Sequence, residues 1–247
     1  MDKIEQCAKL IKHSENILIL TGAGMSTESG IPDYRSQAGL YQGKFQNINP
    51  EVILSLSFFK SNPKIFWEFM KSYMNWTNIE PNIGHKILSK WELNGKKITI
   101  CTQNIDQLHS KSGCNNVIEV HGTLSTATCQ NFRCNKKYNF NKILETKDGY
   151  ICKCGGYIKP DIVLYEEAVD KMSLVYPLMN KSDLLMVLGT SLNVYPVAQI
   201  PKLFQTANKH IIIINKTPTP YENKNNCIEI HKSIGETLDM IDKIINM

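Results

Sequence analysis

Residues 17–27 read Ile-Leu-Ile-Leu-Thr-Gly-Ala-Gly-Met-Ser-Thr, a short apolar run that leads directly into a glycine-rich turn. Unbroken apolar runs of this length are typical of strands that are buried on both faces of a sheet. Gly22 and Gly24 allow the backbone to approach an anion closely, and Ser26 and Thr27 can donate hydrogen bonds or cap a following helix. The stretch therefore predicts a strand that ends in a phosphate-binding turn.

Three further apolar runs of the same kind occur at residues 98–101, 184–188 and 211–214. Because they do not alternate with polar residues, they favour a parallel sheet that is covered by helices on both faces. Amphipathic patterns near both ends of the chain predict two of these helices. We expect an α/β fold whose ligands bind where the carboxyl ends of the strands meet.

Two stretches interrupt the α/β pattern. Residues 36–84 are rich in aromatic side chains and predict a loop followed by short helices, whereas residues 125–158 hold four cysteines and show little apolar periodicity. We expect both stretches to form one smaller module. It would pack on a sheet domain made of residues 1–35, 85–124 and 159–247.

The composition is that of an ordinary globular protein. The 247 residues carry a formal net charge of +5 without a long basic run, so nucleic acid is not an expected partner. No window has the roughly 18 apolar residues of a spanning helix, and the first residues lack the apolar core of an export signal. We therefore expect a cytoplasmic protein with no membrane partner, in which the eight cysteines are mostly reduced.

Four of the cysteines have the spacing of metal ligands. Cys129 and Cys134 form one pair, Cys152 and Cys154 form a second, and two glycines follow the second pair. Four thiolates suit a structural zinc ion that has no open coordination position. The alternative is that these cysteines are reduced or linked by disulfides. The other four cysteines occur singly and are expected to pack in the core.

Polar side chains follow the other apolar runs. Gln103, Asn104 and Asp106 come after one strand, and His121 comes after a shorter apolar run at residues 117–120. Taken singly, they also suit turn residues and a buried structural histidine, but together with the glycine turn they fit the phosphates and riboses of a dinucleotide. An ordinary hydride-transfer dehydrogenase is not the first choice, because the third glycine of its fingerprint and an acidic ribose ligand are missing.

In this order, the motifs resemble those of the sirtuins, the family of NAD-dependent protein deacylases. The matching segments cover almost the whole chain: Gly22–Ser26, Gly30–Arg35, Thr102–Asp106, His121-Gly122, the four cysteines, Lys159–Tyr165, Gly189–Leu192 and Asn215. The resemblance implies a Rossmann-like parallel sheet domain with a smaller zinc-ribbon and helical module. It also implies an NAD-dependent protein lysine deacetylase that yields deacetylated lysine, nicotinamide and O-acetyl-ADP-ribose.

The resemblance further implies the roles of single residues. His121 would be the general base that takes a proton from a ribose hydroxyl, and Asn104 and Asp106 would orient the ribose and the carboxamide. The implied contacts of NAD, the co-substrate, are Gly22, Ala23, Gly24, Thr27, Asp33, Tyr34, Arg35, Gln103, Asn104, Ile105, Asp106, His121, Gly189, Thr190, Ser191, Asn215, Lys216 and Cys227.

The implied partner is an acetyl-lysine protein or peptide that binds as an added strand, a mode that reads the main chain more than the sequence. Its contacts would be Val163, Leu164 and Tyr165 on one side and Val194 and Tyr195 on the other.

In sirtuins specialised for acidic acyl groups, a tyrosine and an arginine stand three residues apart in the helical module. Met70 and Tyr73 align with them here, so the resemblance favours an acetyl or another uncharged acyl group. Nearby carboxylates, from Asp161, Glu166 and Glu167, are expected to offer negative charge to a basic peptide.

Three positions depart from the family pattern. Tyr34 replaces the more usual phenylalanine, whereas Gln107 and Glu166 stand where glycine is more usual. None of these changes removes a catalytic group.

Other functions remain open at this stage. A mono-ADP-ribosyltransferase or an NAD hydrolase could use the same site, and so could a deacylase for other uncharged acyl groups. A zinc-stabilised module that only binds NAD is a further alternative, but the intact set of Asn104, Asp106 and His121 argues against it.

Overall fold

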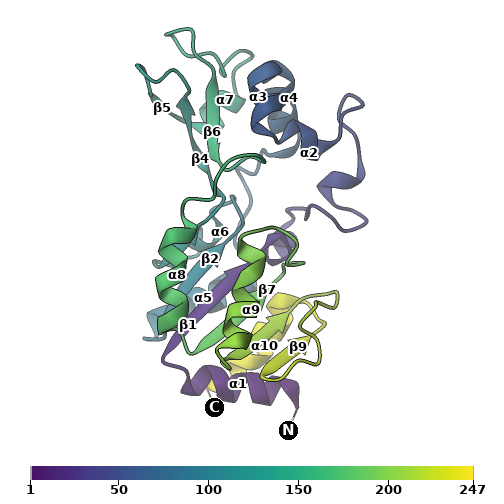
Figure 1. Ribbon diagram of the computed structural model, residues 1–247, viewed down its shortest axis with the longest axis vertical. Coiled ribbons are helices and arrows are strands. Elements are labelled where there is room, and N and C mark those ends of the chain that lie inside the picture. The colour runs from purple at the N-terminus through teal and green to yellow at the C-terminus, as the bar shows by residue number, and fades with distance from the viewer. Residues whose placement is uncertain (1, 247) are drawn as a thin grey trace.

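A six-stranded parallel sheet forms the centre of the larger part of the molecule in the computed structural model, which describes residues 2–246 (Figure 1). Its strands in spatial order are β3 (Val117–Glu119), β2 (Lys97–Thr102), β1 (Asn16–Thr21), β7 (Leu184–Leu188), β8 (His210–Ile214) and β9 (Cys227–Ile230). The chain runs outward from β1 in one direction and then returns to build the other side, which is the Rossmann arrangement. The four predicted apolar runs are the four central strands.

Helices cover both faces of this sheet. The helices are α1 (Lys3–His13), α5 (Ile83–Leu93) and α10 (Ile234–Ile245) on one face, and α8 (Met172–Lys181) and α9 (Ile200–Thr206) on the other. Side chains of β1 alternate between the two cores: Ile17 and Ile19 join the first, whereas Leu18 and Leu20 join the second. This alternation explains why the strand is apolar throughout.

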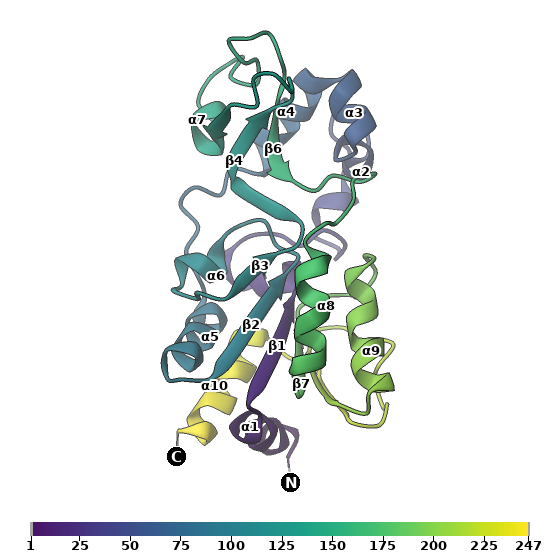
Figure 2. The same ribbon diagram turned by 60° about the vertical axis from the view of Figure 1, so that its left-hand side comes forward.

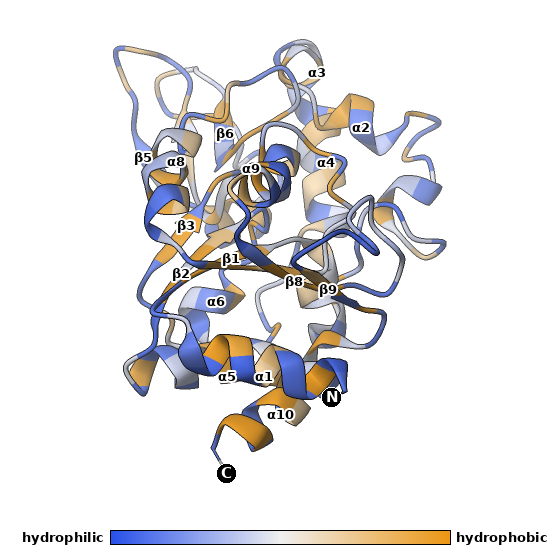
Figure 3. Ribbon diagram, turned by 60° about the horizontal axis from the view of Figure 1, so that its bottom comes forward, coloured by the Kyte–Doolittle hydropathy of each residue, from blue (hydrophilic) through white to orange (hydrophobic). Residues whose placement is uncertain are grey.

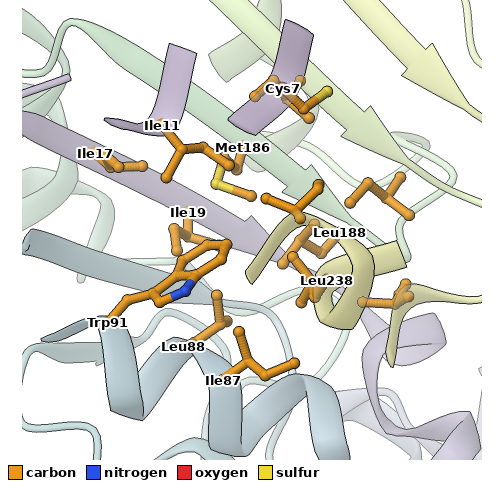
Figure 4. Close-up of a cluster of buried hydrophobic side chains, with 14 of the residues drawn as sticks. Cys7, Ile11, Ile17, Ile19, Ile87, Leu88, Trp91, Met186, Leu188 and Leu238 are labelled. Carbon is orange, nitrogen blue, oxygen red and sulfur yellow. The ribbon is translucent and has the colours of Figure 1, made fainter. Parts of the chain in front are cut away.

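The first of these cores is drawn in Figure 4. Trp91 and Leu88 of α5, Leu238 of α10 and Ile11 of α1 meet there over Ile19 of β1. Figure 3 shows that α1 and α10 alternate apolar and polar colours along their length, as amphipathic helices do. Both predicted terminal helices are therefore present. None of the helices described between residues 2 and 246 is long and apolar enough to span a membrane.

The edge strand β9 is not predicted by the sequence, because Glu229 interrupts its apolar run. Glu229 is nevertheless only 3% exposed. Its carboxylate accepts hydrogen bonds from the backbone N and the Oγ1 of Thr219, at 2.8 and 2.9 Å. Two donors thus compensate the burial of this polar group.

The smaller part combines the two predicted insertions. It contains the antiparallel strands β5 (Lys137–Asn139), β4 (Gly122–Cys129) and β6 (Ile158–Ile162) together with helices α2 (Pro50–Ile53), α3 (Leu56–Ser61), α4 (Pro63–Tyr73) and α7 (Phe140–Leu144). One aromatic core joins them, in which Trp67 of α4 contacts the Phe140 ring and donates its Nε1 hydrogen to the Ile158 carbonyl at 2.9 Å. The small sheet extends slightly beyond residues 125–158, because β4 and β6 remain paired as far as Gly122 and Ile162.

Four short elements complete the chain. They are the 3-10 helices η1 (Ala23–Ser29), η2 (Leu40–Gln42) and η3 (Val197–Gln199) and the helix α6 (Leu108–Lys111). Figure 2 shows β4 reaching from the level of β3 into the smaller part, where β6 lies beside it, so β4 connects the two parts.

Candidate active site

A cavity of about 740 Å³ lies between the two parts, at the carboxyl ends of the parallel strands. Its walls come from the turns after β1, β2, β7 and β8 on one side and from the segment after β6 on the other. All the predicted NAD and peptide contacts line this cavity except Asp106 and Cys227. A crevice at this edge of the sheet is the usual ligand site of such folds.

The glycine turn after β1 packs directly on the turn after β7. The Gly24 N–H donates to the Gly189 carbonyl at 2.8 Å, and a Cβ on Gly24 would lie 2.8 Å from the Gly189 Cα, so only glycine fits. Thr27, which stands where a dinucleotide fingerprint has its third glycine, donates its hydroxyl to the Gly24 carbonyl at 3.0 Å. The turn is thus closed by a side chain and continues as the 3-10 helix η1.

A buried polar network supports this turn from below. Asn104 Nδ2 donates to the Gly22 carbonyl and to Ser26 Oγ, both at 3.0 Å. Ser26 Oγ donates in turn to Asp106 Oδ2 at 2.7 Å, and the Leu108 N–H reaches Asp106 Oδ1 at 2.9 Å. Burial raises the pKa of Asp106, although both hydrogen bonds oppose the shift. The Asp106 carboxylate therefore lies behind the cavity wall and braces Ser26.

His121 lies in the turn between β3 and β4 and lines the cavity. Its Nδ1 is 3.2 Å from the Gln103 carbonyl oxygen, and its own carbonyl accepts the Val163 N–H at 2.8 Å. Burial lowers the pKa of the imidazole, against the opposing effect of the Gln103 contact. In the part of the chain that the structure describes, Nε2 has no hydrogen-bond partner.

The segment after η1 forms another wall of the cavity. The Tyr34 and Tyr41 rings lie 5.1 Å apart, and the Tyr41 hydroxyl is 3.2 Å from the Tyr165 hydroxyl. Burial raises the pKa of Tyr34, so this phenol stays protonated. Asp33 Oδ1 accepts the N–H groups of Arg35 and Ser36, so this carboxylate shapes the turn. The predicted dinucleotide side and the predicted peptide side are thus in direct contact through tyrosines.

The three carboxylates that are expected to offer negative charge to a basic peptide all have partners within the protein. Asp161 Oδ2 accepts the Thr126 hydroxyl at 2.5 Å, and Glu167 Oε2 lies 3.0 Å from the buried Lys159 ammonium. Glu166 accepts hydrogen bonds from Ser57, as described below. Asp161 and Glu166 thus bond to neutral donors, and only Glu167 of the three is paired with a cation.

The alignment of Met70 and Tyr73 with an acyl pocket is also corrected. Met70 is fully buried in the aromatic core, and Tyr73 packs on the ring of Phe69 with centroids 5.1 Å apart. Neither residue lines the cavity, but Met74, the first residue after α4, does. The side of the cavity that follows α4 is therefore still lined by an apolar residue, Met74.

Cys227 is not brought to the cavity. It is the first residue of β9 and pairs with Ile211 at the amino end of β8, whereas the cavity lies at the carboxyl ends. Lys232 and Ile234, which follow β9, line the cavity instead. The sequence reasoning missed them because it did not predict β9.

Glu28 was missed as well. It lines the cavity, and its Oε1 accepts the Gly235 N–H at the start of α10, at 3.1 Å. The only signal in the sequence was its place close to the glycine turn.

The four predicted metal ligands form one cluster. All their Sγ atoms lie within 4.8 Å of one another; those of Cys129 and Cys154 are 3.5 Å apart, and those of Cys134 and Cys152 are 3.6 Å apart. A tetrahedral zinc ion with bonds of about 2.3 Å needs sulfur atoms spaced by about 3.8 Å. The tight second pair is accommodated by Gly155, whose φ is +84°. The cluster is compatible with a structural zinc ion.

Known proteins of one family are similar to this chain over most of its length. A model of the Sir2 family matches residues 22–196. The NAD-dependent protein deacetylase of Clostridium tetani is 44% identical over 244 residues, which cover 96% of each chain. NAD-dependent protein deacetylase 2 of Geobacillus kaustophilus is 43% identical over 250 residues and 99% of each chain.

Solved structures are similar over the same length. A Sir2 protein with a deacetylated p53 peptide and 3'-O-acetyl ADP ribose has a TM-score of 0.89 and 30% identity, with 98% of each chain covered. A complex of Sir2 with a p53 peptide and NAD+ has a TM-score of 0.85 at 30% identity, again over 98% of each chain.

Proposed function

This chain belongs to the Sir2 family and is an NAD-dependent protein deacetylase, and we propose that His121 is the general base of its reaction. NAD supplies the ADP-ribosyl group to which the acyl group of the lysine is transferred. The residues of the chain hold the two substrates next to each other, exclude water and accept the proton.

The observation that carries the proposal is the attachment of His121 to both sides of the cavity. Its ring contacts the Gln103 carbonyl on the dinucleotide side, at 3.2 Å. Its main-chain carbonyl accepts the N–H of Val163 in the segment after β6, at 2.8 Å. The base is thereby held at the point where two substrates, one from each side, would meet.

The hydrogen bonding defines which ring nitrogen acts. A carbonyl only accepts hydrogen bonds, so the proton of the neutral His121 imidazole is on Nδ1, and Nε2 keeps its lone pair. The lowered pKa keeps the ring neutral near pH 7. We propose that Nε2 takes the proton of an NAD ribose hydroxyl, the role for which histidine suits best.

The NAD contacts are proposed along the large sheet. The turn of Gly22 to Gly24 would hold phosphate, because its backbone is open and anions favour such turns. Thr190 and Ser191 would support it, and Asn215 would bind the adenosine ribose. Tyr34 and Ile105 would enclose the nicotinamide.

The acyl-lysine peptide is proposed to bind as an added strand. The Leu164 N–H donates to the Glu167 carboxylate. The Tyr165 N–H donates to the Leu54 carbonyl, and the Tyr165 carbonyl accepts the N–H of Leu56, the first residue of α3. Among the residues that the structure describes, the Val163 carbonyl and the Glu166 N–H have no partner. These two groups would pair with the peptide, with Val194 and Tyr195 on its other side.

The acyl group is proposed to be acetyl or another uncharged group. Met74, Ile162 and Leu164 line the cavity near the proposed peptide segment and are apolar. Desolvating an acidic acyl group there without a cationic partner would be costly.

We also propose that the protein works in the cytoplasm on acyl-lysine proteins. A thiolate zinc site needs reduced cysteines, and cytoplasmic thiol systems keep them reduced.

Nicotinamide release tests the proposal. Wild-type protein is expected to release nicotinamide from NAD only when an acetyl-lysine peptide is present. His121→Ala is expected to lower this rate by roughly 10²- to 10⁴-fold, the usual contribution of a general base. NAD binding to the variant, measured by calorimetry, is the control for folding.

Two outcomes would contradict the proposal. Release without peptide would indicate NAD hydrolysis or ADP-ribosyl transfer, and undiminished deacetylation by His121→Ala would remove the role of the histidine.

A further inference from the structure

We propose that Glu166 is a positioning residue whose carboxylate fastens the peptide-binding segment to helix α3 and thereby sets the affinity for the acyl-lysine peptide. The inference rests on the proposed function, in which the peptide binds along Val163 to Glu166. It assigns no chemical step to Glu166. The segment Leu164 to Glu167 is called the peptide segment below.

The backbone of Glu166 is in an unusual conformation. Its φ is +77°, in the left-handed region that glycine adopts readily and other residues avoid. The sequence also departs from the sirtuin pattern at this position, where glycine is more usual. A glutamate persists in such a conformation only where surrounding contacts hold it there.

The side chain of Glu166 supplies these contacts. Oε2 accepts the main-chain N–H of Ser57 at 2.9 Å, and Oε1 accepts the hydroxyl of Ser57 at 2.8 Å. Ser57 lies in the first turn of α3, where N–H groups have no partner within the helix. A carboxylate at this place is favoured by the helix dipole and forms strong, charge-assisted hydrogen bonds.

The contact between Glu166 and Ser57 is one of several that hold the peptide segment to the rest of the protein. The Tyr165 N–H donates to the Leu54 carbonyl at 3.0 Å, and the Leu56 N–H donates to the Tyr165 carbonyl at 3.1 Å. Glu167, at the end of the segment, is paired with Lys159. Within the peptide segment, all of which the structure describes, only Glu166 has a main-chain N–H left for a peptide. The carboxylate of Glu166 thus holds in place the residue that offers this group.

The proposal predicts a selective effect on peptide affinity. Glu166→Ala keeps the strained backbone and removes the carboxylate, so the peptide segment loosens. We expect the KM for an acetyl-lysine peptide to rise by roughly tenfold, with kcat and the KM for NAD nearly unchanged. Glu166→Gln, whose amide oxygen still accepts one hydrogen bond, is expected to recover part of the loss.

Hydrogen exchange gives a readout that does not depend on activity. In the free protein, the amide of Ser57 is expected to exchange faster in Glu166→Ala than in wild type. Glu15→Ala is the matched control, because Glu15 is exposed and lies just before β1, at the opposite end of the sheet. If the alanine variant folds poorly, Glu166→Gly, which relieves the backbone strain, replaces it. The Ser57 amide is expected to exchange faster in this variant too, because the carboxylate is again missing.

A double-mutant cycle with Ser57→Ala completes the experiment. Removing the Ser57 hydroxyl is expected to raise the peptide KM in the wild-type background and to have little further effect in Glu166→Ala. An unchanged peptide KM in Glu166→Ala, a loss confined to kcat, or equal costs of Ser57→Ala in both backgrounds would overturn the proposal. A wild-type protein without peptide-dependent nicotinamide release would instead refute the proposed function, and the exchange of the Ser57 amide would then decide whether Glu166 holds α3.

Discussion

The imidazole of His121 is held by a main-chain carbonyl and not by a carboxylate. Among the contacts of residues 2–246, its ring has one hydrogen bond, to Gln103. A carboxylate partner would raise the pKa of the imidazole by stabilising the charged form, whereas here burial dominates and lowers it. At the scale of this single residue, the structure therefore favours a base that is already deprotonated at neutral pH.

The lowered pKa of His121 determines how kcat/KM should depend on pH. The neutral imidazole is the active form, so activity is lost as the pH falls through the pKa of His121 in the free enzyme. Because burial lowers that pKa below its ordinary value of about 6.5, we expect the acidic limb of kcat/KM to be centred below pH 6.5. Nicotinamide release over a pH series checks this, with thermal unfolding at each pH as the control. An acidic limb centred above the ordinary histidine value would contradict it.

The position of a residue at the cavity was predictable from the sequence where that residue follows a buried strand. Gly24 and His121 come directly after apolar runs, and the structure brings both to the cavity. Met74 and Lys232 were not predictable in this way, because Met74 follows a helix and Lys232 follows a strand that a buried glutamate conceals. Cys227 was assigned from the resemblance alone, and it lies at the wrong end of its strand.

At the scale of elements, the cysteine cluster lies beside two very short elements, β5 and α7, and we expect it to stabilise them. β5 has three residues and α7 has five, and together they bury few apolar side chains. Elements of this size are not stable alone and depend on the aromatic core of the smaller part and on the cysteine cluster. β6 leaves the same small sheet and leads into the residues that carry the proposed peptide site, so we expect disorder in the cluster to disturb the cavity.

Loss of the metal is therefore expected to affect the smaller part selectively. Cys129→Ser should weaken zinc binding by more than the roughly 10- to 100-fold cost of losing an outer-shell partner. We expect peptide-dependent activity to be lost while most of the far-UV circular dichroism remains, because the large sheet has its own cores. Cys114→Ala, outside the cluster, is the control. A variant that lost zinc and kept full activity would contradict this prediction.

At the scale of the whole molecule, two buried histidines lie between helix α5 and the large sheet. The rings of His85 and His109 are 4.7 Å apart, and His109 Nε2 lies 3.1 Å from Thr21 Oγ1. The other three ring nitrogens have no partner in the described structure. Burial lowers the pKa of His85 to about 4 and that of His109 well below its ordinary value. Both rings are thus neutral in the folded state.

Acid is expected to destabilise the fold through this pair. Below about pH 6.5 the unfolded chain binds protons at both histidines and the folded chain does not, so the free energy of unfolding falls by up to about 1.4 kcal/mol per histidine and pH unit. For His85 the loss ends near its folded pKa of about 4. Urea unfolding between neutral pH and pH 5 checks this. His85→Phe should reduce the slope by one histidine's share, and a slope unchanged from that of the wild type would contradict the prediction.

The overall architecture was largely predictable, for reasons that lie in the sheet. Strands buried on both faces must be apolar throughout, so the four central strands were visible in the sequence. The smaller part gave no such pattern, because its core joins aromatic side chains from two distant insertions. It was visible only through its aromatic composition and its four cysteines. Its packing on the large part was predicted, but single contacts such as the hydrogen bond from Val163 N–H to the His121 carbonyl were not, because they involve the main chain.

The position of β1 in the middle of the large sheet also determines when the protein can fold during synthesis. β1 lies between β2 and β7, and β7 is translated about 160 residues after β1. The centre of the sheet therefore stays open on one side until most of the chain has left the ribosome. By then, all segments of the smaller part have already emerged, so its aromatic core can assemble before the sheet that supports it is closed.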